Sequence, residues 1–156
     1  HLPFFFLRFH HIIAPLQTPQ THVPGFTTVV GGRKRRGHPP TVYGEAVQTR
    51  DGAAEEGGVP ALIGGGGRDG ATGAVLNIAR GEETSVLHLV ALLNQALGTS
   101  LEPEFAPARV GEVRRSAGDP RRARAILGWR PTVGLAEGLS RMVREVLRAG
   151  GETACP

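Results

Sequence analysis

Ala106-Pro-Ala-Arg-Val-Gly-Glu-Val-Arg-Arg-Ser116 lies at the centre of the best-patterned part of the chain, which runs from Gly73 to Leu147. The stretch places Arg109, Arg114 and Arg115 in a loop between two predicted helices. Arginines grouped beside a folded core match a phosphate or carboxylate, because the planar guanidinium binds those groups bidentately. A solvated basic loop is the alternative interpretation, since runs of charge usually face water.

Three helices are predicted around this loop. The first begins at an N-cap, Thr84 or Ser85, and ends at Gly98; apolar residues recur on one face at Val86, Leu89, Val90, Leu93 and Leu97. The second is short and begins at Asp119-Pro120, with Asp119 as N-cap, and ends at Gly128. The inner stripe of the third is predicted to comprise Leu135, Leu139, Met142, Val143, Val146 and Leu147. Residues 75–78 and 101–106 are expected to be extended, and Trp129 is expected to pack against the core.

The segment before Gly73 is less well specified. Much of the chain's 23 Gly lies there, along with several of the 12 Pro. We expect an irregular or disordered segment at 1–38, a partial lobe with one strand and a Gly-rich loop at 39–72, a substrate-binding lobe at 73–148, and a tail at 149–156. Thr41-Val-Tyr43 is the predicted strand, and Gln48-Thr-Arg-Asp51 is predicted to lie in a loop.

Composition limits the classes of function. The formal net charge of +4, carried almost entirely by Arg, favours an anionic partner: nucleic acid, an acidic membrane surface or a phosphorylated small molecule. Cys155 is the only cysteine, so no disulfide framework forms within the chain, which is consistent with a cytoplasmic protein. The apolar run from Leu2 to Leu7 is too short to span a membrane, and no membrane association is expected.

Several motifs have simpler interpretations. Gly65-Gly-Gly-Arg-Asp-Gly70 satisfies G-x-G-x-x-G, but an apolar run with strand character follows it, whereas a dinucleotide site needs a helix there. Gly31-Gly-Arg-Lys-Arg-Arg36 lacks the interleaved aromatics of a nucleic-acid binder and is predicted to be a solvated linker. The histidines near the N-terminus, His1, His10, His11 and His22, lack a metal-ligand spacing.

Five motifs in the chain occur in the order of a known family. They are Thr41-Val-Tyr-Gly44, Gln48-Thr-Arg-Asp51, Asn77-Ile-Ala-Arg-Gly-Glu-Glu-Thr-Ser-Val86, Ala106-Pro-Ala-Arg-Val-Gly-Glu112 and Ala125-Ile-Leu-Gly-Trp-Arg-Pro131. Together they resemble the C-terminal part of nucleotide-sugar epimerases and dehydratases, of the UDP-glucose 4-epimerase type, in the extended short-chain dehydrogenase/reductase superfamily. The resemblance implies an α/β fold: an incomplete substrate lobe of short strands plus three helices.

The resemblance also implies roles by position. Arg50 and Arg109 would contact the diphosphate of a UDP- or dTDP-sugar, and Glu112 would hold the ribose hydroxyls or steady its loop. Thr41 and Tyr43 would line the base pocket. In the family NAD is the cofactor, held by a separate Rossmann domain.

Departures from the family limit what the chain is expected to do. The family's catalytic Tyr is followed four residues later by Lys, but Tyr43 is followed at that spacing by Val47. The N-terminal glycine fingerprint for NAD is also missing, so no catalytic residue and no cofactor-binding residue is assigned. The expected function is that of an epimerase fragment that binds the UDP-sugar diphosphate and is inactive alone.

Two alternatives and one hypothesis about origin stay open. The chain is alternatively a non-catalytic nucleotide-sugar-binding module, or a basic nucleic-acid-binding chain centred on 33–36, which the lack of stacking residues disfavours. Self-association through exposed apolar surface is also expected. The stretch from Gly52 to Gly58 has nearly the family's length but not its residues. This difference suggests that residues 1–38 and 52–70 have drifted or are read in a shifted frame; sequencing the encoding DNA distinguishes the two.

Overall fold

The structure is a computed structural model that describes residues 4–13, 37–54, 58–65, 68, 70–108 and 110–149. Its strands are β1 Phe6–Phe9, β2 Ile12–Ile13, β3 Thr41–Tyr43, β4 Thr49–Arg50, β5 Ala53–Ala54, β6 Val75–Ile78, β7 Thr84–Ser85, β8 Glu104–Ala106 and β9 Arg115–Ser116. Its helices are α2 Gly58–Gly65, α3 Val86–Leu97, α4 Arg121–Leu127 and α5 Leu135–Ala149. The fold is therefore mixed α/β, as predicted.

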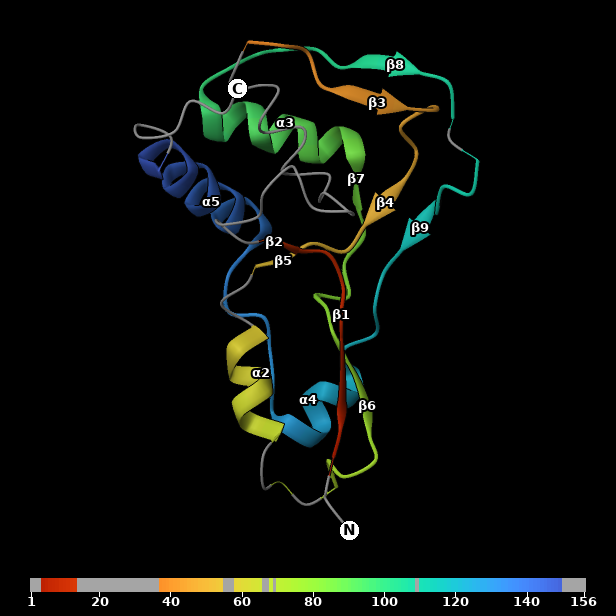
Figure 1. Ribbon diagram of the computed structural model, residues 1–156, viewed down its shortest axis with the longest axis vertical. Coiled ribbons are helices and arrows are strands. Elements are labelled where there is room, and N and C mark those ends of the chain that lie inside the picture. Colours follow the sequence, from red (N-terminus) through yellow and green to blue (C-terminus); the bar gives the residue numbers. More distant parts are fainter. Residues whose placement is uncertain are drawn as a thin grey trace.

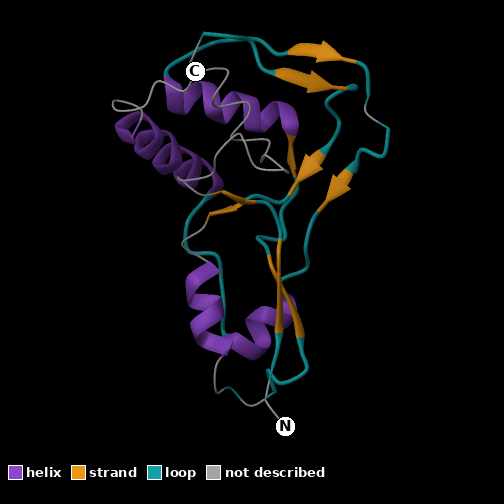
Figure 2. Cartoon of the chain, viewed as in Figure 1, coloured by secondary structure: helices purple, strands orange, loops and turns teal. Residues whose placement is uncertain are grey.

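The elements form an upper and a lower part, each with its own hydrophobic core (Figure 1). The upper part contains α3, α5 and strands β3, β4, β7, β8 and β9. The lower part contains α2, α4, β1 and β6, and the β2–β5 pair lies between the two parts (Figure 2). The chain crosses between the two parts more than once, because each core takes residues from segments that lie far apart in sequence.

Helix α3 confirms its sequence signals. The Ser85 hydroxyl accepts a hydrogen bond from the His88 backbone N–H at 3.2 Å, and Gly98 ends the helix in the left-handed conformation at φ +64°. The predicted stripe is buried at Val86, Leu89, Val90 and Leu93. This face packs against α5 and forms the upper core.

Helix α5 corrects its predicted stripe at one position. Leu139, Met142 and Val143 are buried against α3, whereas Leu147 is 49% exposed. Val146 packs against the upper core, but Leu147 is not among the described residues that do so. Periodicity predicted the correct face of the helix, but it did not predict how far along the helix this face is buried.

Helix α4 begins one residue later than predicted. The N-cap position is Pro120, while the Asp119 carboxylate accepts a hydrogen bond from the Arg121 backbone N–H at 2.9 Å. The Arg121 side chain also binds this carboxylate, and together these hydrogen bonds lower the pKa of Asp119 to about 2. Gly128 ends the helix as predicted, and Trp129 is buried in the lower core.

The segment before residue 73 holds more structure than its sequence predicted. Within 1–38, β1 pairs in parallel with β6, with Phe6 opposite Val75 and Phe9 opposite Ile78, so the irregular assignment is wrong for β1. Within the predicted Gly-rich loop, residues 58–65 form helix α2 rather than coil. Ala61 of this helix is fully buried against the lower core, which stabilises a helix that its glycines disfavour. Residues 6–9 and 12–13 thus belong to the fold.

Three short strand pairings lie in the upper part of the molecule. Strand β3 pairs in parallel with β8, and β4 lies between β7 and β9. Thr49 and Arg50 were predicted to lie in a loop, but they form β4. Their neighbours β7 and β9 come from segments that lie far along the chain, so local sequence did not reveal the pairing. No helix in the described part of the chain is long and apolar enough to cross a membrane.

Candidate functional site

Arg50 lies in β4, where its guanidinium is held by groups from the loop that leads into β9. One nitrogen, Nη1, donates to the Val113 carbonyl at 2.7 Å and to the Thr49 carbonyl at 2.8 Å. The other, Nη2, donates to Glu112 Oε1 at 3.4 Å. Only 14% of the Arg50 side chain is exposed, so its charge is positioned before any ligand arrives.

Glu112 is the second predicted residue that the structure brings to this point. It lies 62 residues from Arg50 in sequence and forms an ion pair with it. Its other carboxylate oxygen, Oε2, is buried and accepts no hydrogen bond from the residues that the structure describes. A buried acceptor of this kind can take a hydrogen bond from a donor that the protein does not supply, such as a hydroxyl.

Asp51, next to Arg50, is fully buried and connects three segments of the chain. Its carboxylate accepts hydrogen bonds from the backbone N–H groups of Arg80 at 2.8 Å, Gly81 at 2.9 Å and Gly118 at 3.2 Å. Gly118 permits this approach, because a Cβ there would lie 2.6 Å from the Cβ of Ala79. Asp51 therefore fixes the position of β4 relative to β6 and to the loop before α4.

His11 lies in the short connection between β1 and β2, beside this cluster. Its carbonyl accepts a hydrogen bond from the Ala53 N–H at 3.3 Å, and its backbone has a φ of +32°, which is uncommon outside glycine. Desolvation lowers the pKa of His11, and the charges of Arg50 and His10 lower it further, against the opposing effect of Asp51. The neutral imidazole is consequently favoured in the folded chain.

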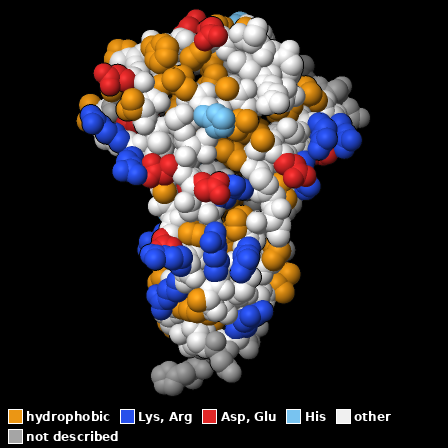
Figure 3. All heavy atoms as spheres, turned by 180° about the vertical axis from the view of Figure 1, so that it is seen from behind, with side chains coloured by type: hydrophobic (Ala, Val, Ile, Leu, Met, Phe, Trp, Pro, Cys, Tyr) orange, Lys and Arg blue, Asp and Glu red, His pale blue; other side chains and the backbone are white. Residues whose placement is uncertain are grey.

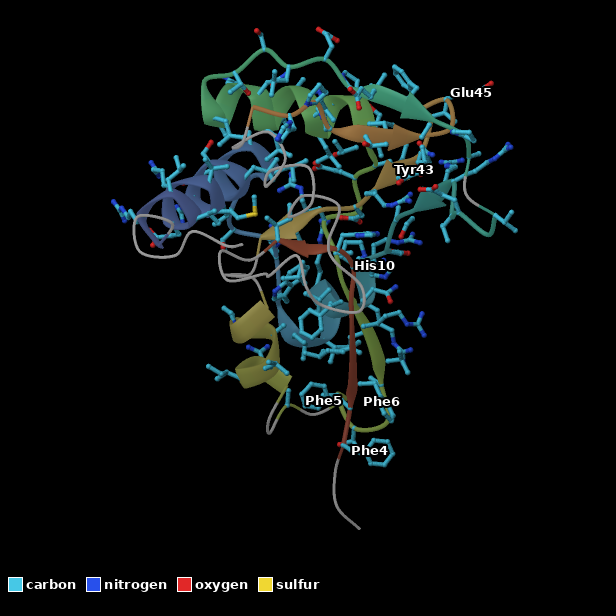
Figure 4. All side chains as sticks on the ribbon, turned by 45° about the horizontal axis from the view of Figure 1, so that its top comes forward. Phe4, Phe5, Phe6, His10, Tyr43 and Glu45 are labelled. Atoms are coloured by element: carbon cyan, nitrogen blue, oxygen red, sulfur yellow. The ribbon has the colours of Figure 1, made fainter. Side chains whose placement is uncertain are left out.

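Thr41 and Tyr43 lie on β3, which pairs with β8 in a different sheet from the one that holds Arg50. Thr41 pairs with Glu104 and Tyr43 with Ala106 of β8, which leads directly into the loop that carries Glu112. The Gln48 side-chain amide donates to the Tyr43 carbonyl at 2.6 Å and so connects β3 to the start of β4. In Figure 4, Tyr43 and Glu45 lie together in the upper part, away from the labelled phenylalanines.

The three arginines of the loop differ in the structure. Arg109 lies outside the described residues, so its predicted contact with a diphosphate stays a prediction. Arg114 is exposed. Arg115 belongs to strand β9, and its guanidinium binds Glu83 through Nε at 3.0 Å and Nη2 at 2.5 Å. This pairing, together with a hydrogen bond from Thr49, lowers the pKa of Glu83.

The G-x-G-x-x-G run does not have the setting of a dinucleotide loop. Helix α2 ends at Gly65, and the next regular element is strand β6, so no helix begins at these glycines in the part that the structure describes. Among the same residues, no group of three or more His, Cys, Asp or Glu side chains could hold a metal ion. His1, His22 and the basic run 33–36 lie outside them.

Sequence reasoning missed two residues of the site. The sequence assigns Asp51 no role, and only the structure shows that this residue is fully buried next to a predicted ligand-binding arginine. His11 lies in a segment that was assigned as irregular. The hydrophobic run before it was the only signal available, and this run is now seen to be strand β1.

Comparisons with known proteins point to one group of enzymes. No protein-family model matches the chain. It is 35% identical over 133 residues to the UDP-glucose 4-epimerase of Mycolicibacterium smegmatis, a match that covers 85% of this chain and 42% of the relative. The sequence match is longer than residues 73–156 together with 39–51, so it also includes residues from the less well-patterned segments.

Solved structures give the same result. The UDP-glucose 4-epimerase of Thermotoga maritima, solved with UDP-glucose, is 32% identical with a TM-score of 0.89, over 97% of this chain and 48% of that one. MoeE5, solved with UDP-glucuronic acid and NAD, is also 32% identical, with a TM-score of 0.81, over 92% of this chain and 46% of that one. The chain therefore spans a little less than half the length of these proteins.

Proposed function

Because the chain belongs to the NAD-dependent epimerase and dehydratase family of the extended short-chain dehydrogenase/reductase superfamily, we propose that it is the nucleotide-sugar-binding part of such an enzyme. In this proposal Arg50 binds the diphosphate of a UDP- or dTDP-sugar, and Arg109 assists from the neighbouring loop. Glu112 accepts a hydrogen bond from a ribose hydroxyl. Thr41 and Tyr43 line the pocket for the base.

The contact between Arg50 and Glu112 carries this proposal. Two residues far apart in sequence, one a cation and one a carboxylate with a buried free oxygen, meet at the border of β4 and the 107–114 loop. Arg50 can donate charge-assisted hydrogen bonds to a phosphate, and Glu112 can accept a hydrogen bond from a hydroxyl. Relatives solved with UDP-glucose and UDP-glucuronic acid support the choice of ligand.

The described residues do not fit NAD. The glycine run lies at the end of α2 instead of the start of a helix, where a pyrophosphate would find backbone N–H groups. Tyr43 is not followed by Lys at the family's spacing. We therefore propose that the chain by itself does not convert UDP-glucose to UDP-galactose; formation of UDP-galactose after addition of NAD would refute this.

Replacing Arg50 by glutamine is expected to weaken UDP-glucose binding by about 10- to 150-fold. A hydrogen bond to a charged group contributes about 1.5–3 kcal/mol, and each 1.4 kcal/mol is tenfold in affinity. Isothermal titration of UDP-glucose into the wild type and Arg50→Gln measures the difference.

The matched control is Arg148→Gln, which removes the same charge from an exposed side chain on α5. It should bind UDP-glucose like the wild type. Circular dichroism of both variants separates loss of binding from loss of fold. Equal affinities for Arg50→Gln and Arg148→Gln in folded proteins would show that Arg50 is not the diphosphate ligand.

The pKa of His11 is expected to rise when UDP-glucose binds. The diphosphate would offset the Arg50 charge that now helps to lower this pKa. By linkage, affinity should then increase as the pH falls below 6.5, the ordinary value for histidine. The His11 ring signals in an NMR pH titration, with and without ligand, measure the shift, and His88 on α3 serves as an internal reference.

The same pKa predicts how His11 affects stability without ligand. A histidine whose pKa is lower in the folded state favours folding when neutral, so its contribution is fully present above pH 6.5 and is lost as the pH falls through the folded-state value. In Arg50→Gln the His11 pKa should move upward. An unchanged pKa in that variant would mean that Arg50 does not act on the imidazole.

One observation favours an alternative function, the binding of nucleic acid. Figure 3 shows Arg side chains gathered over the lower part of the molecule, where α4 contributes the exposed Arg121, Arg122 and Arg124. Arg121 is paired with Asp119, which reduces the charge available to a polyanion. Binding to a nucleic acid that falls steeply with salt, without a response to UDP-glucose, would favour this alternative.

A further inference from the structure

Gln48 is a buried polar residue to which the proposed function gives no role. It lies between Tyr43 of β3 and Arg50 of β4 in the sequence, and only 6% of the residue is exposed. Its Nε2 group donates a hydrogen bond to the Tyr43 carbonyl at 2.6 Å. Its Oε1 atom is buried and accepts no hydrogen bond from the residues that the structure describes. Because an unpaired buried acceptor is costly, native structures usually provide a donor for it.

The contact with Tyr43 fixes the orientation of the Gln48 carboxamide. If the amide were turned by 180°, its oxygen would lie about 2.6 Å from the Tyr43 carbonyl oxygen, and two acceptors would face each other. The nitrogen therefore faces Tyr43, and Oε1 points away from it. The unpaired atom is consequently an acceptor, and its partner has to be a donor.

The backbone N–H groups on both sides of Gln48 already have acceptors. The Gly44 N–H donates to the Ala106 carbonyl at 2.8 Å, next to the pairing of β3 with β8. The Thr49 N–H donates to the Arg114 carbonyl at 2.8 Å, next to the pairing of β4 with β9. Neither N–H can turn to Oε1 without weakening a strand pairing. The donor for Oε1 is therefore expected to come from a ligand.

The turn that holds Gln48 is also strained. Ala46 has a φ of +57°, a left-handed conformation that residues other than glycine seldom adopt, and the residue is only 2% exposed. Strained residues of this kind cluster at binding sites and switch regions. Residues 44–48 thus combine backbone strain with an unpaired acceptor, and they connect the strand of Tyr43 to the strand of Arg50.

The carboxamide lies on the side of the site that the proposed function gives to the base. A Cβ at Gly44 would lie 3.4 Å from both Gln48 Nε2 and the Cβ of Ala108, so the amide is close to the start of the 107–114 loop. In a sugar nucleotide, the ribose and the base lie on one side of the diphosphate and the sugar lies on the other. Glu112 is assigned to a ribose hydroxyl, so the base is the remaining source of a donor on this side.

We propose that Gln48 is a specificity-determining residue whose Oε1 accepts a hydrogen bond from the N3–H group of uracil or thymine. Cytosine has no hydrogen on N3 and leaves this acceptor without that partner. Oε1 is buried in the structure, so the strained turn at residues 44–48 moves when the base binds. The inference rests on the proposed function for the place of the base, but it assigns Arg50 no part in base recognition.

A comparison of UDP with CDP tests the proposal, because the two ligands share the ribose and the diphosphate. Isothermal titration of the wild-type chain should show UDP binding at least about tenfold more tightly, since a buried acceptor disfavours a ligand that lacks the matching donor. In Gln48→Met, which retains an unbranched side chain without the amide, this preference should fall to about threefold or less. Inorganic pyrophosphate should bind the variant and the wild type equally.

The matched control is Gln95→Met, since Gln95 is exposed on α3. This variant should retain the wild-type preference for UDP over CDP. Circular dichroism checks that both variants are folded. Equal affinities of the wild type for UDP and CDP would overturn the proposal, as would a folded Gln48→Met that still prefers UDP.

An NMR measurement on the wild type does not require the Gln48→Met variant to fold. The side-chain N–H signals of Gln48 should shift when UDP is added, because the carboxamide gains a hydrogen bond to the base. Pyrophosphate should leave these signals nearly unchanged. Equal shifts with UDP and pyrophosphate would overturn the proposal.

Arg50→Gln separates this inference from the proposed function. This variant should bind UDP and CDP more weakly, but the ratio of the two affinities should remain that of the wild type. If pyrophosphate binds through Arg50 and UDP is not preferred over CDP, the inference about Gln48 fails alone. If UDP is preferred through Gln48 and Arg50→Gln has no effect, the diphosphate assignment fails and the inference about Gln48 stands.

Discussion

Asp51→Ala is expected to lose about 3–5 kcal/mol of unfolding free energy, the largest effect of any single change predicted for this chain. Asp51 is fully buried and accepts three backbone hydrogen bonds, from Arg80, Gly81 and Gly118. Alanine would leave three donors without partners in the interior, and each unsatisfied buried donor costs about 1–3 kcal/mol. A domain has only about 5–15 kcal/mol of stability in total, so the variant should be largely unfolded or close to it.

Urea denaturation followed by circular dichroism measures the effect of Asp51→Ala. The midpoint should fall by about 1–5 M, given a slope of about 1–3 kcal/mol per molar urea. Asp51→Asn should lie between alanine and the wild type, because its amide retains one acceptor oxygen. Asp119→Ala is the control: this carboxylate also accepts a backbone hydrogen bond, but it is exposed. Equal midpoints for Asp51→Ala and Asp119→Ala would show that the buried contacts are not what stabilises the junction.

The candidate site is also expected to depend on Asp51 for its structure. The residues that it contacts come from the end of β6 and the loop before α4, which belong to the lower part, whereas Arg50 beside it belongs to the upper part. Loss of this carboxylate should therefore disturb Arg50 and His11 before the two cores melt. An Asp51 variant that is still folded but no longer binds UDP-glucose would show that the site is disturbed without unfolding of the two cores.

Leu139→Ala is expected to destabilise the chain by about 2–5 kcal/mol, while Leu147→Ala changes stability by less than about 1 kcal/mol. Both leucines lie on α5, and both were predicted from periodicity to face the core. Leu139 is fully buried against α3, whereas Leu147 is 49% exposed. Removing a buried leucine side chain loses its transfer free energy and leaves a cavity, but an exposed one loses little of either.

The pair Leu139→Ala and Leu147→Ala is its own control, since the chemical change and the helix are the same. Urea midpoints should differ by about 1 M or more. Similar losses in both variants would mean that α5 is covered along its whole length, for example by a partner or by residues outside the described part. Similar small effects in both would mean that the α3–α5 core contributes little to stability.

The sequence pattern was sufficient to predict those helices whose caps and apolar faces lie within one continuous segment. Helix α3 has a capping serine, an apolar face and a terminal glycine within one continuous segment, and all three behave as predicted. Arg50 and Glu112 were identified through motifs in a resemblance, and the structure brings them into contact. Whether they bind a diphosphate and a ribose stays a prediction.

Other features depended on contacts between distant segments. Strand β1 reads as an apolar run interrupted by Arg8, because a parallel strand beside a core does not alternate between polar and apolar residues. Its partner β6 lies about half the chain away, so no local signal indicated the pairing. Helix α2 has poor helix formers, and burial of Ala61 against the lower core outweighs their propensity.

Sequence alone was therefore sufficient for the class of fold, the amphipathic helices and the family, because helix caps and 3.6-residue periods act over a few neighbouring residues. The tertiary structure alone decided that Asp51 connects the two parts, that Arg115 is engaged by Glu83, and that Leu147 faces water. These outcomes depend on which distant backbone or side chain occupies the adjoining space. Burial and hydrogen-bond pairing depend on these three-dimensional surroundings, so they cannot be predicted from a residue's type or from its spacing in the sequence.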